Sequence, residues 1–345
     1  MELFKKYFFR LSLLVGIFVA FIYYISKNLP IIIHTFDVTI SQSLIYLLLT
    51  LVLSLLAYFF LVLMNKKVFG MLGIQRKTSE MFNLLTSALA INVLVPTGGF
   101  SAGIMFTQDA KRRGESGAVV ISALTLALLA NYTSIVVLLI FAIVYLTAIN
   151  ALGLHVIIPA IIFLLITFGL FLLIYLAGKN KTFLNKFLSL LIRSWQKCLS
   201  VFHKKRKSDK NTAENFANEL AKVYNTIVSD PRDLYVAAGY IFLSHFFYLA
   251  SLYVLFMSLG LFPLYRIIIS GYVIGLMFVV ISPTPNGVGF VEGSMVLAYT
   301  SLGLPGAAAA TVALIYRGFS FWLPLMFGFI VLQKNHLLRL MEGSK

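Results

Sequence analysis

The sequence predicts an all-α, polytopic membrane protein. Sixty per cent of its 345 residues are hydrophobic, 12% are charged, and the mean hydropathy is +0.94. A chain with a water-facing surface carries about twice that share of charge. Several apolar stretches reach the roughly 20 residues that an α-helix needs to cross a bilayer, and the alternating segments of a membrane barrel are not found. A soluble fold is therefore excluded.

Uninterrupted apolar stretches give six predicted crossings, at residues 7–25, 40–64, 117–146, 156–177, 234–259 and 306–332. Two further apolar segments, residues 81–106 and 267–302, are each broken near the middle by proline and glycine. Proline removes a backbone donor, and glycine allows backbone angles that other residues resist. Each broken segment therefore predicts a helix that stops and restarts.

The net charge of +16 comes from bases at the ends of these stretches. Of the 28 Lys and Arg residues, 25 lie within residues 5–10 at the start of the first stretch, within 65–78, at 111–113, within 179–232 or after 332. Such residues accumulate on the cytoplasmic side of a membrane. We therefore expect a protein of the bacterial cytoplasmic membrane with both termini in the cytoplasm, and no nucleic-acid partner.

This topology orients the two broken segments. Residues 81–106 lie between two basic flanks, so they enter and leave on the cytoplasmic face, as a re-entrant hairpin. Residues 267–302 follow Arg266 on the outer side and precede a span that runs inward, so the second hairpin opens outward. The two hairpins are thus predicted to be opposed.

An offset of 189 residues between the two halves supports the same arrangement, because it matches five residue pairs without a gap. The pairs are Pro96 with Pro285, Gly98 with Gly287, Gly114 with Gly303, Gly117 with Gly306 and Ala118 with Ala307. We predict one membrane domain over residues 1–345 that contains an inverted repeat, with units at about 40–146 and 234–332. The basic connector at about 178–233 could hold an interfacial helix at residues 182–207, or it could be a plain linker.

The hairpin breaks are the first candidate binding elements. Irregular backbone at membrane depth normally lines a polar cavity, and a helix that restarts offers free N–H groups to a phosphate. The alternative is a kinked helix that packs without a ligand. The residues expected to bind substrate here are Pro96, Gly98, Gly99, Pro285, Asn286, Gly287 and Gly289.

Two charges lie inside the predicted hydrophobic region. Arg317 stands about 16 Å into the last span at 1.5 Å per residue, and Glu292 follows Pro285 on the restarting arm. Isolated charges at such depth cost at least a few kcal/mol, so a mutual pair or a polar ligand is expected. A structural salt bridge and a direct role in binding both remain open.

Asp109 and Arg112 lie where the first hairpin returns to the cytoplasmic face. Arginine binds phosphate bidentately, so these residues could bind a lipid headgroup. A run of bases at the end of a span is also the usual topology anchor.

Other chemistry is not encoded in recognisable motifs. Cys198 is the single cysteine, and the five histidines lack ligand spacing, so we expect no metal site. Nucleotide-binding and hydrolase motifs are not found, and we expect no cofactor.

Several of these motifs together resemble a known family. They are the turn Pro96-Thr97-Gly98-Gly99-Phe100, the bases at 111–113, and the stretch from Ser282 through Gly293 to Tyr316-Arg317. In these residues the chain is similar to the transmembrane domain of bacterial lysylphosphatidylglycerol synthase/flippase proteins and their stand-alone relatives. The resemblance implies handling of membrane phospholipid, with Tyr316 beside Arg317 at the site. It does not imply lysine transfer, because the separate soluble domain that carries that activity has no counterpart in this sequence.

The leading functional hypothesis is a translocase for phospholipid, anionic or aminoacylated. A lipid-modifying enzyme of the phosphatidylglycerol lysyltransferase type, with Glu292 or Asp109 as acid/base, is one alternative. A secondary transporter of small solutes is the other. The sequence also leaves room for a homo-oligomer.

Overall fold

The computed structural model describes residues 44–94, 100–148, 150, 152–180, 182–184, 186, 212–261, 265–282 and 284–334, and these residues form helices and no strands. Five helices are long and apolar enough to cross a membrane. They are Leu44–Met71, α4 (Gly117–Ala148), α5 (Leu154–Lys179), α8 (Pro231–Ser258) and the last span Gly306–Gln333. They confirm the helical membrane class and correspond to five of the predicted crossings. The crossing predicted at 7–25 lies outside the described residues.

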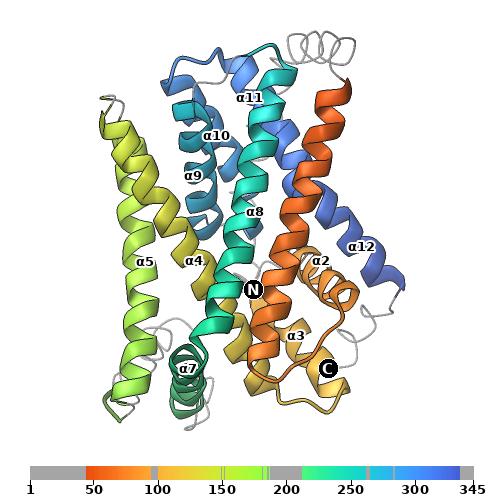
Figure 1. The fold of residues 1–345 in the computed structure, drawn as a ribbon, viewed down its shortest axis with the longest axis vertical. Coiled ribbons are helices and arrows are strands. Elements are labelled where there is room, and N and C mark those ends of the chain that lie inside the picture. The colour runs from red at the N-terminus through yellow and green to blue at the C-terminus, as the bar shows by residue number, and fades with distance from the viewer. Residues whose placement is uncertain are drawn as a thin grey trace, which may run out of the picture.

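Each broken segment is a pair of short helices. The first pair is α2 (Thr78–Leu94) and α3 (Phe100–Arg112), and the second is α9 (Tyr265–Ile281) and α10 (Phe290–Ser301), with a 3-10 turn η1 (Pro285–Gly287) between them. Figure 1 shows α2 and α3 in the lower half of the molecule and α9 and α10 in the upper half. This placement agrees with opposed hairpins, while their re-entrant insertion and the inverted repeat stay predictions.

The last span is interrupted by a π-helical turn. α11 (Gly306–Arg317) is followed by η2 (Gly318–Trp322) and then by α12 (Leu323–Lys334). α12 packs along α2, and α4 packs along α9, so the first arm of each hairpin is covered by a long helix from the other half. At the α12 crossing, a Cβ atom on Gly328 would lie 2.0 Å from the carbonyl oxygen of Thr86, so the two backbones are in direct contact.

The connector between the halves contains a helix that the sequence analysis did not predict. α7 (Thr212–Ser229) packs against α4 and α5. It buries Ala217, Leu220 and Val223, which recur at helical spacing, and Glu219 on the same helix accepts a 2.6 Å hydrogen bond from Ser122 Oγ. The interfacial helix considered at 182–207 lies almost entirely outside the described residues.

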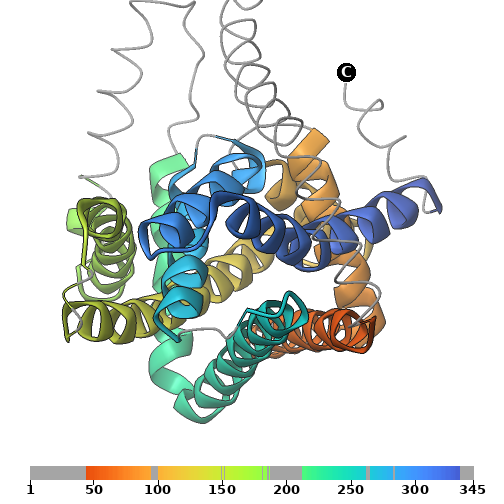
Figure 2. The ribbon, with the colours of Figure 1, turned by 90° about the horizontal axis from the view of Figure 1, so that it is seen from above.

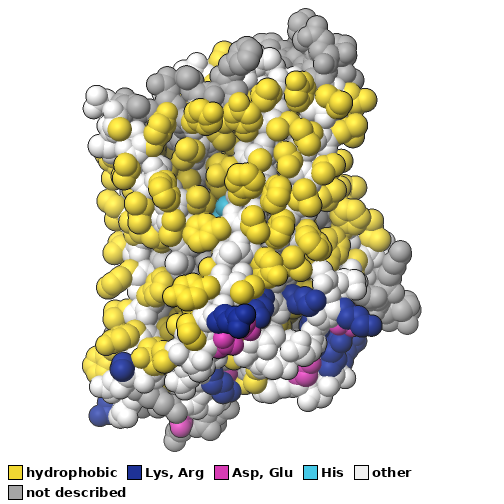
Figure 3. All heavy atoms as spheres, in the orientation of Figure 1, with side chains coloured by type: hydrophobic (Ala, Val, Ile, Leu, Met, Phe, Trp, Pro, Cys, Tyr) yellow, Lys and Arg dark blue, Asp and Glu magenta, His cyan; other side chains and the backbone are white. Residues whose placement is uncertain are grey.

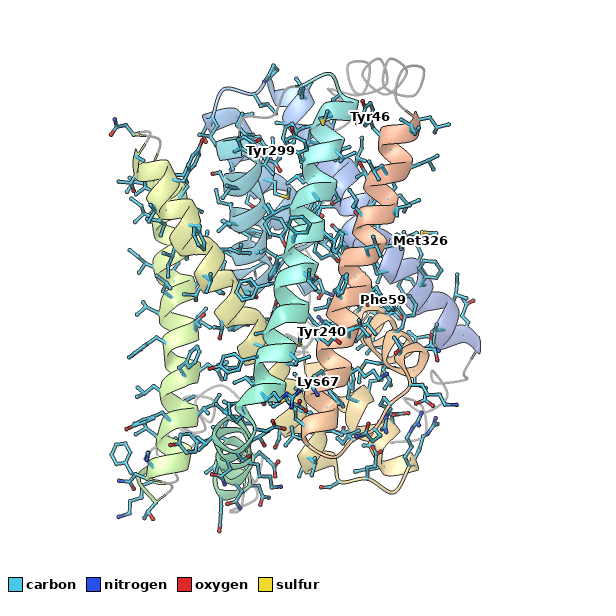
Figure 4. The ribbon with its side chains drawn as sticks, viewed as in Figure 1. Tyr46, Phe59, Lys67, Tyr240, Tyr299 and Met326 are labelled. Atoms are coloured by element: carbon cyan, nitrogen blue, oxygen red, sulfur yellow. The ribbon has the colours of Figure 1, made fainter. Side chains whose placement is uncertain are left out.

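The outer surface separates apolar and charged side chains. Apolar side chains cover the upper and middle parts in Figure 3, and Lys and Arg gather at the lower end. Lys67, labelled in Figure 4, lies near that end, and its Nζ is 2.5 Å from a carboxylate oxygen of Asp233 on α8. Seen from above in Figure 2, Leu44–Met71 lies beside α8, where the rings of Phe60 and Phe247 stack with centroids 5.4 Å apart.

Candidate functional site

A cavity of about 180 Å³ lies inside the helix bundle. Its walls come from Leu44–Met71, α4, α8, α9, α10, α11 and η2, so it joins the second hairpin to the long helices. Apolar side chains such as Val291 and Met295 form part of the wall. The polar lining residues are Asn131, Ser244, His245, Tyr248, Tyr272, Tyr316, Arg317 and Ser320. A cavity that brings several polar groups together in so apolar a bundle is the default candidate for a binding site.

Arg317 is the charged residue of this wall, and it is paired. Its Nε donates to Glu292 Oε1 at 2.7 Å, and the two side chains are 7% and 2% exposed. Nη2 donates to the carbonyl oxygen of Asn286 at 3.2 Å, and the guanidinium carbon stands 4.2 Å from the centroid of the Phe321 ring. The pair predicted from sequence is therefore present, and it ties α10 and η1 to α11. The π-helical turn that follows Arg317 is a feature often found at functional sites.

The turn of the second hairpin is built around Asn286 and Gly287. Both have positive φ angles, of 52° and 73°. A side chain on Gly287 would also meet Val291, since a Cβ there would lie 2.3 Å from Val291 Cγ2. The turn is thus specified by its residues, as the Pro/Gly pattern indicated.

The free N–H groups expected at the restart of α10 already have an anion beside them. Gly289 N donates to Glu292 Oε2 at 2.7 Å, so the carboxylate that pairs with Arg317 also caps α10. A carboxylate is stabilised at a helix N-terminus by the helix dipole. A phosphate at this position would have to displace Glu292.

The tip of the second hairpin contacts the first hairpin. Asn92, near the end of α2, donates from Nδ2 to Asn286 Oδ1 at 3.2 Å, and α2 packs against η1. Pro96, Gly98 and Gly99, expected to bind substrate, lie outside the described residues. The two hairpins are therefore joined next to the Arg317 pair.

A buried polar chain crosses the cavity wall. His245 of α8 is hydrogen-bonded through Nε2 to Ser134 Oγ of α4 at 2.8 Å and through Nδ1 to Tyr272 Oη of α9 at 2.6 Å. Sequence reasoning considered His245 only as a metal ligand and did not consider Tyr272. The available signal was a histidine inside an apolar span, which is a candidate functional residue by default.

At the basic end, Arg76 joins the loop before α2 to the last turn of α3 and to the loop between α3 and α4. Its side chain is 3% exposed and pairs with both oxygens of Glu115, at 2.6 and 2.5 Å, and with Asp109 at 3.3 Å. Arg113 pairs with Asp109 and Glu80, at 3.3 and 3.4 Å. The hydrogen bonds from Arg76 are the main cause that lowers the pKa of Glu115.

The structure thus divides the predicted site residues. Tyr316 and Arg317 line the cavity, and Glu292 and Asn286 contact Arg317. Pro285, Gly287 and Gly289 shape the adjoining turn. Asp109 and Arg112 lie at the end of α3, where Asp109 is held by two arginines and Arg112 is exposed without an ion pair to a described residue. These two residues do not line the cavity.

Metal binding finds no support in the described part of the chain, where no three His, Cys, Asp or Glu side chains gather closely enough to hold an ion. Cys198 lies outside that part. The described polar groups of the site are hydrogen-bonding side chains and one buried ion pair.

Comparison with known protein families identifies the family of this protein. The family model described as the lysylphosphatidylglycerol synthase TM region matches residues 6–328. The chain belongs to this family. Membership in the lysylphosphatidylglycerol synthase TM family indicates a function related to membrane lipid, and the match covers every helix of the cavity wall. A search of curated proteins found no match.

Proposed function

We propose that the protein is a phospholipid translocase and that the cavity is its headgroup site. The observation that carries the proposal is a cavity beside Arg317 that brings several polar groups together among apolar helices, in a protein of a lipid-related family. A lipid headgroup that crosses a bilayer must exchange its water for other polar partners. The cavity offers hydroxyl, amide, imidazole and guanidinium groups.

Arg317 is the proposed contact for the headgroup phosphate. Guanidinium binds carboxylate and phosphate oxygens in the same geometry, so a phosphate can compete with Glu292 for it. Since Glu292 also caps α10, release of Arg317 would change the contact between α10 and α11 without leaving the carboxylate free of partners. Headgroup binding and hairpin position would then be coupled.

The arrangement of the hairpins supports alternating access. They lie at opposite ends of the molecule, and each is covered by a long helix from the other half. Transporters with inverted repeats use this kind of architecture to expose a central site to one side at a time. We propose that the basic end faces the cytoplasm and that the exposed Arg112 is a first contact for headgroups there.

Reconstitution into vesicles tests the proposal. Vesicles with trace phosphatidylglycerol, labelled on an acyl chain with a dithionite-sensitive fluorophore, are compared with protein-free vesicles. We expect the protein to increase the fraction of label that external dithionite can reach over time. The same rate with and without protein, across anionic, zwitterionic and aminoacylated lipids, would disprove the proposed function.

Two arginine variants distinguish the effect of a charge in the cavity wall from the effect of a charge on the surface. Arg317→Met removes the proposed phosphate contact and is expected to reduce translocation at least tenfold. Arg232→Met removes an exposed arginine at the start of α8 and is expected to translocate as the unaltered protein does. Equal translocation by both variants would contradict the role of Arg317. Binding of labelled lipid to both variants in detergent shows whether the loss arises at the headgroup site.

A further inference from the structure

We infer that His245 binds one proton when a headgroup phosphate occupies the cavity, so that a proton crosses the membrane together with the lipid. This inference rests on the proposed function and names the ion that moves with its substrate. A proton gradient then supplies the energy for net movement of the lipid.

His245 lies where such a proton is needed. It is buried in α8, lines the cavity, and is hydrogen-bonded to Ser134 of α4 and to Tyr272 of α9. Because α4 belongs to the first half of the chain and α9 to the second, the ring stands where the two halves meet. Histidine is the side chain whose charge ordinarily changes near neutral pH, and histidines inside membrane bundles often relay protons.

The other titratable groups around the cavity do not change charge near neutral pH. Tyrosine is neutral there and arginine is charged. Glu292 is held as a carboxylate because it pairs with Arg317 and caps α10. The groups that face His245, with their immediate partners, are Tyr248 of α8, Tyr272 of α9, Tyr316 and Arg317 of α11, Glu292 of α10, and Tyr58 of Leu44–Met71, which interacts with Tyr248.

The hydrogen bonds of the ring leave a place for the proton. Ser134 donates to the carbonyl oxygen of Asn131 at 2.7 Å, so it accepts from Nε2 of His245, and Nδ1 accepts from Tyr272 Oη at 2.6 Å. A proton that adds to Nδ1 makes this nitrogen a donor, and the tyrosine hydroxyl, which can donate or accept, becomes its acceptor. The hydrogen of that hydroxyl then needs another acceptor. Since Tyr272 lines the cavity, an oxygen of a bound phosphate can accept it.

Charge balance couples the proton to the phosphate. Arg317 and Glu292 neutralise each other, so the empty cavity is neutral when His245 is neutral. A phosphate brings one negative charge that this pair does not compensate, and a buried charge without compensation is costly. A proton on His245 restores neutrality. Phosphate and proton therefore favour each other's binding.

Proton uptake by the purified protein in detergent is the first test. Short-chain phosphatidylglycerol, whose phosphate is its sole charge, is added near neutral pH in weak buffer, and an indicator dye records the protons taken up. We expect up to about one proton per bound lipid, and a Kd that rises by up to about tenfold per pH unit above neutral. Binding without proton uptake, at a Kd that does not change with pH, would overturn the inference.

Two histidine variants assign the proton. His245→Gln keeps a side chain that can donate and accept hydrogen bonds but does not titrate, so proton uptake should vanish. His155→Gln, in the first turn of α5, is the matched control and should take up protons as the unaltered protein does, because α5 contributes no described residue to the cavity wall. Undiminished uptake in His245→Gln would contradict the assignment. If that variant does not fold, uptake by the unaltered protein still decides whether a proton binds with the lipid.

Proteoliposomes with a pH gradient test the coupling itself. Valinomycin with equal potassium on both sides holds the membrane potential at zero, and fluorescent phosphatidylglycerol is the probe. We expect the label to accumulate in the leaflet on the alkaline side, beyond its level in protein-free vesicles under the same gradient. Rapid crossing with equal label in both leaflets would disprove the proton coupling and leave the proposed function standing. Crossing no faster than in protein-free vesicles would mean that the proposed function itself fails.

Discussion

Glu292 uses one carboxylate to hold both Arg317 and the first turn of its own helix. Its two oxygens accept from Arg317 Nε and from Gly289 N, each at 2.7 Å. The same side chain thus stabilises α10 locally and fixes α10 against α11. Removal of the negative charge weakens both contacts. The guanidinium of Arg317 is then buried without a counter-ion, and the N-terminus of α10 loses its anionic cap.

Glu292→Gln is expected to destabilise the protein strongly. Removal of one partner of a buried ion pair costs about 3–5 kcal/mol, because the remaining charge stays out of water. Thermal unfolding in detergent should show a clear fall in midpoint. The double variant Glu292→Gln/Arg317→Met should lose less than the sum of the single changes, since it leaves no buried charge. A midpoint equal to that of the unaltered protein for Glu292→Gln would show that the pair does not stabilise the fold.

Gly328 is predicted to be intolerant of any side chain. A Cβ atom there would lie 2.0 Å from the Thr86 carbonyl oxygen, so α12 would have to move away from α2. We expect Gly328→Ala to cost about 1–3 kcal/mol, the usual range for overpacking. Gly169→Ala in α5 is the control, because a Cβ atom added there would have no neighbour within 4 Å, and alanine favours a helix. Equal melting of the two variants would contradict the close contact.

The sequence predicted the long helices and the hairpin breaks, because these depend on local properties. Hydropathy over some twenty residues locates a span, and proline with glycine locates a break. The pair of Glu292 and Arg317 could also be predicted from the sequence, since two opposite charges in apolar surroundings are expected to meet. Its occupation of the α10 N-terminus was not foreseen, and that contact changes where a phosphate can bind.

Contacts between distant segments explain what the sequence did not show. Ser134 and His245 are 111 residues apart, and Arg76 and Glu115 are 39 apart. No periodic pattern links such residues, and Arg76 in particular looked like one more cytoplasmic base. α7 is different, because Ala217, Leu220 and Val223 carried a helical pattern that the charge of the connector obscured.

The Arg76 cluster is expected to make stability depend on pH. The pKa of Glu115 lies below its usual value near 4.5, first because of the hydrogen bonds from Arg76. A carboxyl whose pKa is lowered by folding stabilises the protein fully above its unfolded pKa, and this contribution is lost as the pH falls through the folded pKa. At pH 7 we expect Glu115→Gln to be about 1–3 kcal/mol less stable than the unaltered protein. The difference should shrink below pH 4.5 in melts recorded over a pH series; a constant difference would contradict the assignment.

The hydrogen bonds of Ser134 determine which groups donate and which accept in the series Ser134–His245–Tyr272. Ser134 Oγ also lies 2.7 Å from the carbonyl oxygen of Asn131, which can only accept, so the single hydroxyl proton goes there. Ser134 Oγ must then accept from His245, which places the imidazole proton on Nε2. In the neutral form of the ring Nδ1 is then the acceptor, and Tyr272 donates to it. A neutral His245 thus has both ring nitrogens satisfied.

These donor and acceptor roles predict the effect of removing either hydroxyl that is hydrogen-bonded to His245. Tyr272→Phe leaves Nδ1 of His245 buried without a donor, and Ser134→Ala leaves the Nε2 proton without an acceptor. Each change is expected to cost about 1–3 kcal/mol, the penalty for an unsatisfied buried polar group. Tyr175→Phe in α5 removes the same hydroxyl from a side chain on the outer surface and should melt with the unaltered protein. The double variant Tyr272→Phe/His245→Leu should recover part of the loss, because an apolar side chain needs no partner; a further loss instead would mean that His245 is stabilised by other contacts.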